Sequence, residues 1–265
     1  MIEIVEVTDN LREEYNSQLL RFEKYFTYPF GDDSFTINHG SNYFRFFDLL
    51  GTPYILALKD KERIIGITVL VLRNIDILNN GQLEPIWYIC DLKIHPGYRG
   101  EGIIQQVSNF AISNYSKLSS KIYGISMNST THKVNRLVYL AKRLTNINLT
   151  YQETLIFYLL NKNQLNHAGN LLMCHFSKYG YFSLNEIKDL VMMRTEKPLP
   201  LIHVVPKDKS NIIEEAEEYN YMFCLPSSNI LINELTQAGI TAASTASIIS
   251  NLTEANWNFI LSSEI

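Results

Sequence analysis

The stretch DLKIHPGYRGEGI, residues 91 to 103, holds the residue types and spacing in this chain that are best suited to chemistry. An alternating apolar strand pattern runs into a proline, then into Arg99, Gly100 and Gly102, and from there into a helical pattern. Backbone amides at a helix N-terminus lack partners, and the helix dipole adds partial positive charge. Glycines let a ligand approach the backbone closely, and arginine adds a charge-assisted contact. We therefore expect an anion site, such as a phosphate site, at this turn.

The turn differs from two common phosphate-binding loops, because neither GxxxxGK[ST] nor GxGxxG is present in it. Residues Asp91 to Ile103 instead resemble the acyl-CoA-binding motif of the GNAT-type N-acetyltransferases, a strand and turn of the form DLxVxPxxRGxGI. The family motif ends with another glycine or alanine, where this chain has Ile104.

The resemblance implies that acetyl-CoA is the co-substrate. Backbone amides around residues 99 to 104 would hold its diphosphate, and main-chain groups of the strand 91 to 95 would pair with its pantetheine arm. The cofactor-binding residues implied in this way are Leu92, Lys93, Ile94, Arg99, Gly100, Glu101, Gly102, Ile103, Ile104 and, ahead of a helix tyrosine, Asn135.

The implied reaction moves an acetyl group from the CoA thioester to a primary amine, by direct attack through a tetrahedral intermediate. The amine must lose a proton, and an acid helps the thiolate to leave. Asp91 is the candidate proton relay, although a strand-end carboxylate can equally make structural hydrogen bonds. Tyr139, in VNRLVYLAKRL, resembles the helix tyrosine that protonates the thiolate, although it can equally face the core. Cys90 stands where some members of the family have a glutamate base.

The acceptor pocket has candidates in the segment FTYPFGDD, which proline and glycine make loop-like. Its aromatic residues are Phe26, Tyr28 and Phe30, and two more aromatic residues, Tyr25 and Phe35, lie close to its two ends. They can line the pocket, and core packing explains them equally well. Asp32 and Asp33 would suit a cationic acceptor, although paired loop aspartates are usually just solvated. Whether the amine belongs to a small molecule or to a protein stays open.

The order of predicted elements is strand, two helices, three strands, helix, strand, helix and strand, which predicts a mixed α/β fold. We expect a mixed, mostly antiparallel central sheet with helices on both faces. The run LIHVVPKDKS, followed by helix, strand, helix and strand, repeats the order that follows the motif at 91 to 103, but it has no glycine at the turn. This order predicts a smaller, GNAT-like C-terminal α/β domain that has lost its phosphate-binding turn, although alternating strands and helices recur in any α/β protein and can equally explain it.

The polar segment 161 to 170 is the best linker candidate, which predicts an acetyl-CoA-binding catalytic domain over 1 to 162 and a C-terminal domain over 163 to 265. In that second domain LLMCHFSKYGYFSL and NWNFILSS read as strands, and NIIEEAEEYN reads as a short helix. We expect the second domain to shape the acceptor cleft or to form a dimer contact.

A net charge of -4 argues against a nucleic-acid partner, which usually calls for a basic field. No apolar run is long enough to span a bilayer, and the N-terminus carries acids where a secretory signal has lysines, so we expect a cytoplasmic protein with no membrane partner. The histidines and cysteines share no metal-ligand spacing, so no metal site is proposed. The alternative to an enzyme is a non-catalytic acyl-CoA-binding or protein-interaction module that keeps the fold.

Overall fold

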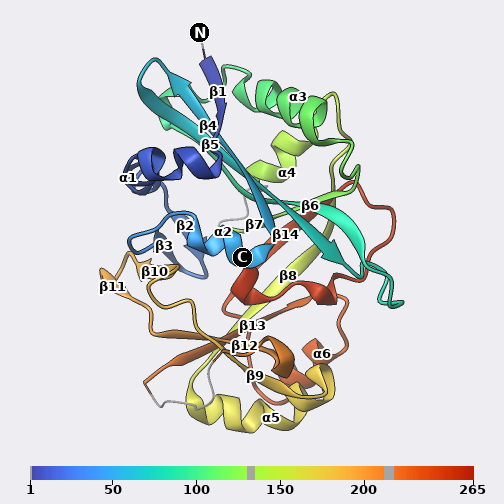
Figure 1. The fold of residues 1–265 in the computed structure, drawn as a ribbon. Helices are drawn as coiled ribbons and strands as arrows, with labels where there is room; N and C mark the ends of the chain where they lie inside the picture. The colour runs from blue at the N-terminus through green and yellow to red at the C-terminus, as the bar shows by residue number, and fades with distance from the viewer. Residues whose placement is uncertain (1, 130–134, 212–217) are drawn as a thin grey trace.

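The computed structural model describes residues 2–129, 135–211 and 218–265 (Figure 1). Its helices are α1 (Arg12–Glu23), α2 (Arg45–Leu50), α3 (Ile103–Tyr115), α4 (Arg136–Ala141), α5 (Lys162–Phe176) and α6 (Leu231–Gln237). Its strands are β1 (Ile2–Glu6), β2 (Tyr28–Phe30), β3 (Asp33–Asn38), β4 (Thr52–Asp60), β5 (Arg63–Ile75), β6 (Glu84–Ile94), β7 (Ile122–Met127), β8 (Thr150–Leu160), β9 (Tyr179–Phe182), β10 (Asp189–Met192), β11 (Lys197–Pro198), β12 (Leu201–Pro206), β13 (Asn220–Pro226) and β14 (Ser244–Ser250). No helix in these ranges is long and apolar enough to cross a membrane.

The main sheet of the described residues has ten strands in the order β1-β4-β5-β6-β7-β14-β8-β13-β12-β9. Its pairs are antiparallel except β6 with β7 and β12 with β13. A smaller sheet, in the order β11-β10-β3-β2, joins an N-terminal hairpin to a C-terminal one. The predicted mixed and mostly antiparallel α/β fold is therefore confirmed.

Two parts of the main sheet repeat the same local pattern. Strand β6 pairs in parallel with β7 over Trp87–Ile89 and leads into a 3-10 helix at Pro96–Tyr98. Strand β12 pairs in parallel with β13 over residues 201–203 and leads into a 3-10 helix at Lys207–Lys209. The predicted echo of the motif at 91 to 103 thus has a counterpart in the fold. The helix predicted in NIIEEAEEYN lies largely outside the described residues.

The N-terminal and C-terminal parts of the sheet exchange the strands β8 and β14. The late strand β14 lies between β7 and β8, and β8 continues on its other edge to β13 (Figure 1). Strands from before and after residue 162 therefore belong to one continuous hydrogen-bonded sheet. The division into 1–162 and 163–265 stays a prediction.

The segment predicted to be a linker is helical. Asn161 and Gln164 form a capping box, in which each side chain accepts from the other residue's backbone amide, and α5 follows at once. Leu165, Ala168 and Leu172 lie on its buried face. Because α5 reaches Phe176, the strand predicted in LLMCHFSKYGYFSL is wrong except for β9.

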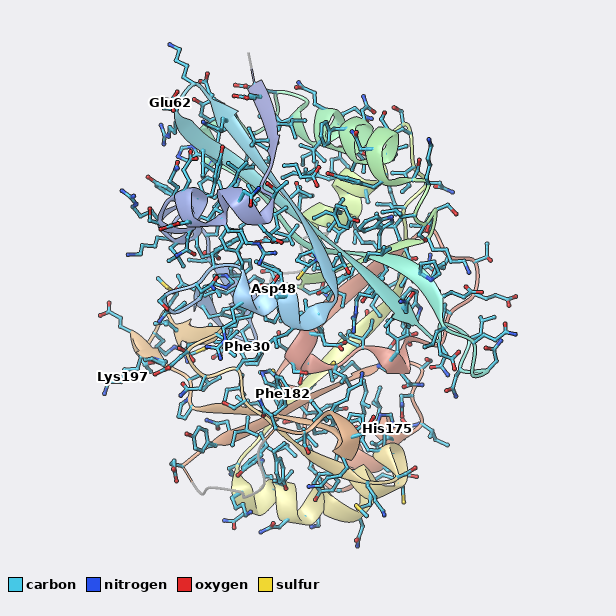
Figure 2. The ribbon with its side chains drawn as sticks, viewed as in Figure 1. Phe30, Asp48, Glu62, His175, Phe182 and Lys197 are labelled. Carbon is cyan, nitrogen blue, oxygen red and sulfur yellow. The ribbon has the colours of Figure 1, made fainter. Side chains whose placement is uncertain are left out.

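Two further predictions of local structure are wrong. NWNFILSS forms 3-10 helices at Trp257–Phe259 and Ser262–Glu264 rather than a strand. The loop predicted in FTYPFGDD is instead largely the β2–β3 hairpin, in which Tyr28 faces Phe35 across the strands. That hairpin carries aromatic side chains into the core that runs through both parts of the molecule, where Phe30 from β2 and Phe182 from β9 pack (Figure 2).

Candidate functional site

Over the part that carries the motif, strand β6 has one edge that pairs with no other strand among the described residues. On one side it pairs with β5 as far as Ile94, while on the other its pairing with β7 ends at Ile89. The register with β5 shifts so that Ile89 and Asp91 face consecutive residues of β5, which leaves Cys90 as the extra residue of a β-bulge. From residue 90 onward, main-chain groups are available to pair with an extended ligand.

The turn after β6 has the geometry expected of an anion site. Gly100 and Gly102 have φ of 91° and 72°, which favours glycine, and an added Cβ at either would meet no described atom within 4 Å. No side chain in the described ranges caps α3, so its first amides are not occupied by one. The exposed Arg99 stands beside the turn, and its Nε donates to the carbonyl of Ile94 at 3.3 Å.

The departure from the motif at Ile104 is accommodated inside the protein. Ile103 is buried, and Ile104 packs partly buried against the same apolar cluster. The extra bulk is therefore accommodated by packing, and the two glycines remain open. Glu101 is exposed between them.

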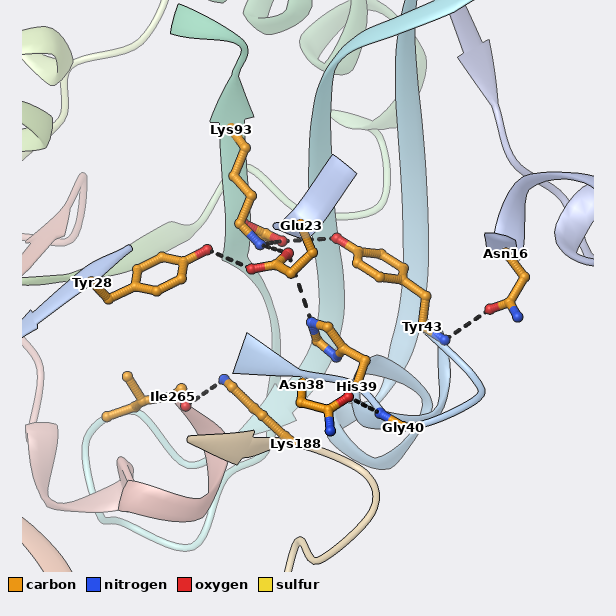
Figure 3. Close-up of polar contacts among 11 residues, drawn as sticks. Asn16, Glu23, Tyr28, Asn38, His39, Gly40, Tyr43, Lys93, Lys188 and Ile265 are labelled. Carbon is orange, nitrogen blue, oxygen red and sulfur yellow. Dashed lines mark hydrogen bonds and ion pairs between the residues drawn. The ribbon is translucent and has the colours of Figure 1, made fainter. Parts of the chain in front are cut away.

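A buried charged cluster adjoins the free edge of β6 (Figure 3). The ammonium of Lys93 donates to the carboxylates of Glu23 and Asp91, the latter at 2.6 Å. Tyr43 donates its hydroxyl to Asp91 at 3.0 Å, and Tyr28 donates to Glu23 at 3.0 Å. Both Asp91 and the side chain of Lys93 are thus fixed in place, so Lys93 can serve a cofactor only through its main chain.

Burial and charge shift the pKa values in this cluster. Burial raises the pKa of Glu23 against the opposing charge of Lys93. For Lys93, burial lowers the pKa, but Asp91 and the other acidic neighbours outweigh it and the net pKa is raised. His39, on the loop after β3, is 2% exposed, and burial lowers its pKa to about 2. Lys93 therefore stays charged at neutral pH and His39 stays neutral.

A cavity of about 180 Å³ opens beside Asp91. It is bounded by the β6 residues from Ile89 to Lys93 and by the end of β7 from Ile125 to Met127, where the two strands separate. Its other polar lining residues include Tyr28, His39, Ser126, Lys188, His203 and Ser262, and its apolar lining includes Phe30, Phe35, Phe46, Phe47, Phe157 and Met222. The cavity therefore connects the free edge of β6 with residues of both parts of the chain.

Side-chain hydrogen bonds of Asn135 connect the start of α4 to the end of β7. Its amide nitrogen donates to the carbonyl of Ser126 at 3.0 Å and to the side chain of Asn128 at 2.9 Å. One turn later, Tyr139 is 51% exposed rather than core-facing, and its hydroxyl accepts from Arg143. Because Ser126 lines the cavity, Asn135 sets the position of the helix that carries Tyr139 relative to the cavity.

Sequence reasoning overlooked three charged or titratable residues near the cavity: Glu23, His39 and Lys188. Glu23 had a signal, because it follows Leu19 and Phe22 on the apolar face of α1, where a charged residue needs a partner. For His39 and Lys188 no local pattern stands out, since their surroundings come from distant segments.

The expected acceptor segment contributes only in part. Tyr28, Phe30 and Phe35 line the cavity, whereas Phe26 packs in the core and Tyr25 is exposed. The loop aspartates lie outside the cavity lining. Asp32 pairs with Arg194 at the surface at 3.2 Å, and Asp33 accepts from the backbone amide of Ser34. Asp91, by contrast, brings its side-chain carboxylate to the cavity.

No protein-family model and no curated protein matches this sequence. Among solved structures, a tandem GNAT protein from the clavulanic acid biosynthesis pathway is 10% identical with a TM-score of 0.53, over 94% of this chain and 98% of that one. A GNAT family acetyltransferase from Elizabethkingia anophelis with acetyl-CoA bound is 11% identical over 94% and 96% of the chains, with a TM-score of 0.38. Arabidopsis thaliana NAA60 in complex with acetyl-CoA is 17% identical over 59% and 88%, with a TM-score of 0.42.

The first of these similarities spans both chains almost completely. The protein therefore has the tandem GNAT fold, as the motif at 91 to 103 and its echo at 201 to 210 predict.

Proposed function

We propose that this protein transfers an acetyl group from acetyl-CoA to a primary amine at the cavity beside Asp91. The observation that carries the proposal is the continuity of three features: the open turn at Gly100 and Gly102, the free edge of β6, and the cavity at its bulge. A diphosphate, an extended pantetheine arm and a thioester need these features in this order.

The cofactor would lie with its diphosphate on the amides of residues 99 to 104. Its pantetheine arm would extend along β6 from residue 94 back toward Cys90, pairing with main-chain groups. The acetyl group then reaches the bulge, where a strand amide can polarise the thioester carbonyl. The protein's own groups thus bind, align and polarise the thioester before the amine arrives.

The chemistry proceeds by direct attack. The amine nitrogen forms a bond to the carbonyl carbon and passes a proton to Asp91, whose carboxylate Lys93 and Tyr43 hold in place. The tetrahedral intermediate then expels the CoA sulfur, and Tyr139 donates the proton that the leaving thiolate takes up. The products are an acetamide and free CoA.

Cys90 favours direct attack over an acetylated-cysteine intermediate. Its thiol lines the cavity, and burial raises its pKa to about 12. A thiol with that pKa is almost entirely protonated at neutral pH, and the thiolate is the nucleophilic form. Cys90→Ser should therefore retain acetyl transfer.

A non-catalytic acyl-CoA-binding module is the second candidate, favoured by the structural hydrogen bonds that Asp91 makes to Lys93 and Tyr43. Calorimetry with acetyl-CoA, combined with a free-thiol release assay over a panel of amines, separates the two. The enzyme releases CoA only when an amine is present, whereas the module binds acetyl-CoA and releases none with any amine.

Asp91→Asn tests the catalytic part of the proposal, with Asp32→Asn as its matched control. Asp91→Asn should lower kcat by roughly 100- to 10,000-fold, the usual contribution of general acid–base catalysis, while acetyl-CoA affinity stays unchanged. Asp32 is exposed and outside the cavity, so its variant should behave as wild type. Equal kcat values for the two variants would exclude Asp91 as the group that accepts the amine proton.

A further inference from the structure

Most polar side chains that line the cavity already have hydrogen-bond partners within the protein. Tyr28 donates to Glu23 at 3.0 Å, and Lys93 donates to Glu23 and Asp91. The remaining bonds join Lys188 to the main-chain oxygen of Ile265 at 2.6 Å, Ser126 to Asn135 at 3.1 Å, and His203 to Ser262 at 2.9 Å. A ligand that used these groups would have to compete with bonds that already exist, so they offer it little.

Two lining residues, Asp91 and His39, keep positions at which a ligand can bind. Lys93 and Tyr43 both donate to one carboxylate oxygen of Asp91, Oδ2, and no described residue donates to the other, Oδ1. His39 is 2% exposed, and neither of its ring nitrogens has a hydrogen-bond partner among the described residues. Because a buried polar group that lacks a partner is rare in proteins, this imidazole indicates a ligand that supplies one.

The position that His39 offers is an acceptor. Its Nε2 is 3.8 Å from a carboxylate oxygen of Glu23, beyond hydrogen-bond range but close enough for the negative charge to favour the proton on Nε2. The neutral ring carries one N–H, so Nδ1 keeps its lone pair. Oδ1 of Asp91 and Nδ1 of His39 are therefore both acceptors, and a group that satisfies them must carry at least two hydrogen-bond donors.

His39 and Asp91 lie at the same end of the cavity. Tyr43 contacts both, because its ring centre lies 4.7 Å from that of His39 and its hydroxyl donates to Asp91 at 3.0 Å (Figure 3). A neutral primary amine has two N–H donors and one lone pair. When its two N–H groups bind the two acceptors, its lone pair stays available for attack on the thioester.

Away from this end, the walls of the cavity are apolar and largely aromatic. They include Phe46 and Phe47 of α2, Phe157 of β8 and Met222 of β13. A second charged group on the ligand would lie against these walls without an available partner, which is costly. The cavity volume of about 180 Å³ exceeds the roughly 150 Å³ of an apolar cavity that takes up benzene. The body of the ligand is therefore apolar and about the size of one ring or one branched alkyl group.

We infer that the amine acceptor is a compact, apolar primary amine without a second charged group, whose nitrogen is held by Asp91 and His39 together. This inference rests on the proposed acetyl transfer and adds the substrate class. It assigns His39 as the residue that orients the attacking nitrogen by accepting one of its N–H groups.

Calorimetry on the full chain tests the substrate class without any chemistry, in the presence of CoA, which has no acetyl group to transfer. Phenethylamine is compared with phenylalanine, which adds a carboxylate, and 3-methylbutylamine with 1,4-diaminobutane, which has a second amine in place of the branched end. We expect the better of the two apolar amines to bind roughly 10- to 100-fold more tightly than its charged counterpart, the range expected for burying one group without a partner. Equal affinities, or no binding of either apolar amine, would overturn the inference.

His39→Phe and His39→Asn test the role of the imidazole, with His167→Phe, at an exposed position of α5, as the control. His39→Phe keeps an aromatic ring but removes both nitrogens, and it should weaken binding of the apolar amine roughly 2- to 10-fold, the range of one neutral hydrogen bond. His39→Asn places an acceptor close to the position of Nδ1 and should restore most of that affinity. His167→Phe should leave it unchanged.

Two further measurements separate this role from a purely structural one. Thermal unfolding shows whether each variant is folded, and the affinity for acetyl-CoA should be unchanged in all of them. A His39 that only packs in the core could alter Tm but would not alter amine affinity or show rescue by asparagine. Unchanged amine affinity in folded His39→Phe would overturn the assignment of His39.

The outcomes distinguish this inference from the proposed function. Binding of an apolar amine that depends on His39, with no release of CoA from acetyl-CoA, would support the ligand class and refute acetyl transfer. Acetylation of phenylalanine or 1,4-diaminobutane as readily as of the apolar amines would support acetyl transfer and refute the apolar substrate class.

Discussion

Replacing Gly102 by glutamate should abolish tight binding of acetyl-CoA without unfolding the protein. A glutamate at this position would place a negative charge at the N-terminus of α3, where the diphosphate is proposed to lie. At about 6 Å and an effective dielectric constant of about 40, each diphosphate charge is opposed by about 1.4 kcal/mol. Two such charges correspond to about 3 kcal/mol, or a roughly 100-fold increase in Kd.

A glutamate at position 102 also strains the backbone, and Gly239, which has a similar φ, provides a matched control for that strain. Gly102 has φ of 72°, and Gly239, at the end of α6, has φ of 75°, with no described atom within 4 Å of an added Cβ at either. A non-glycine residue in this region costs about 1–2 kcal/mol, or a Tm lower by roughly 2–8 °C in a protein of this size. Gly239→Glu should therefore show the same loss of Tm as Gly102→Glu.

Calorimetry with acetyl-CoA separates the two variants. We expect Gly239→Glu to bind as wild type and Gly102→Glu to lose about two orders of magnitude in affinity. Gly102→Ala, which adds strain without charge, should show a much smaller loss than the glutamate. If Gly102→Glu binds as tightly as Gly239→Glu, the diphosphate does not lie at this turn.

The buried cluster and Tyr139 give three further predictions. Lys93→Met leaves two buried carboxylates without their cation and should lower the free energy of unfolding by about 3–5 kcal/mol, measured by chemical unfolding. Adding Glu23→Gln should partly reverse that loss. An unchanged free energy of unfolding in Lys93→Met would refute the ion pair. The pKa of His39 is about 2 in the folded protein and near 6.5 in the unfolded chain, so between these values only the unfolded chain binds the proton. This protonation does not affect the free energy of unfolding above pH 6.5, and it lowers that free energy by about 3 kcal/mol at pH 4.5. His39→Phe should remove that loss in pH-dependent unfolding, whereas His167→Phe, at an exposed position, should keep it. Tyr139→Phe should lower kcat while acetyl-CoA affinity is retained, and an unchanged kcat over the pH range of the assay would exclude Tyr139 as the acid.

The open turn at Gly100 and Gly102 could be predicted because its information is local. Gly100 and Gly102 need left-handed backbone and precede a helix, and the alternating strand pattern before them fixes which way the turn faces. The same reasoning detects the echo at 201 to 210, where a strand again ends in proline. Features set within about ten residues of each other are visible in the sequence.

Features that depend on distant segments could not be predicted. The order of the sheet is one, because β14 lies between β7 and β8 for reasons of packing that no local pattern reports. The position of Lys188 is another, since Phe46 and Ile265 come from opposite ends of the chain. The helix α5 is different, because Asn161 and Gln164 have the spacing of a capping box, a local signal for a helix start that the polar composition of the segment masks.

Hydrogen exchange of the backbone amides, with and without acetyl-CoA, tests the central claim most directly. The proposed site predicts protection at residues 90 to 94 and 99 to 104, in the free edge of β6 and the turn before α3. It predicts no protection at residues 201 to 210, where the echo of the motif lacks its glycines. Protection at 201 to 210 instead, or no protection at either place, would contradict the account.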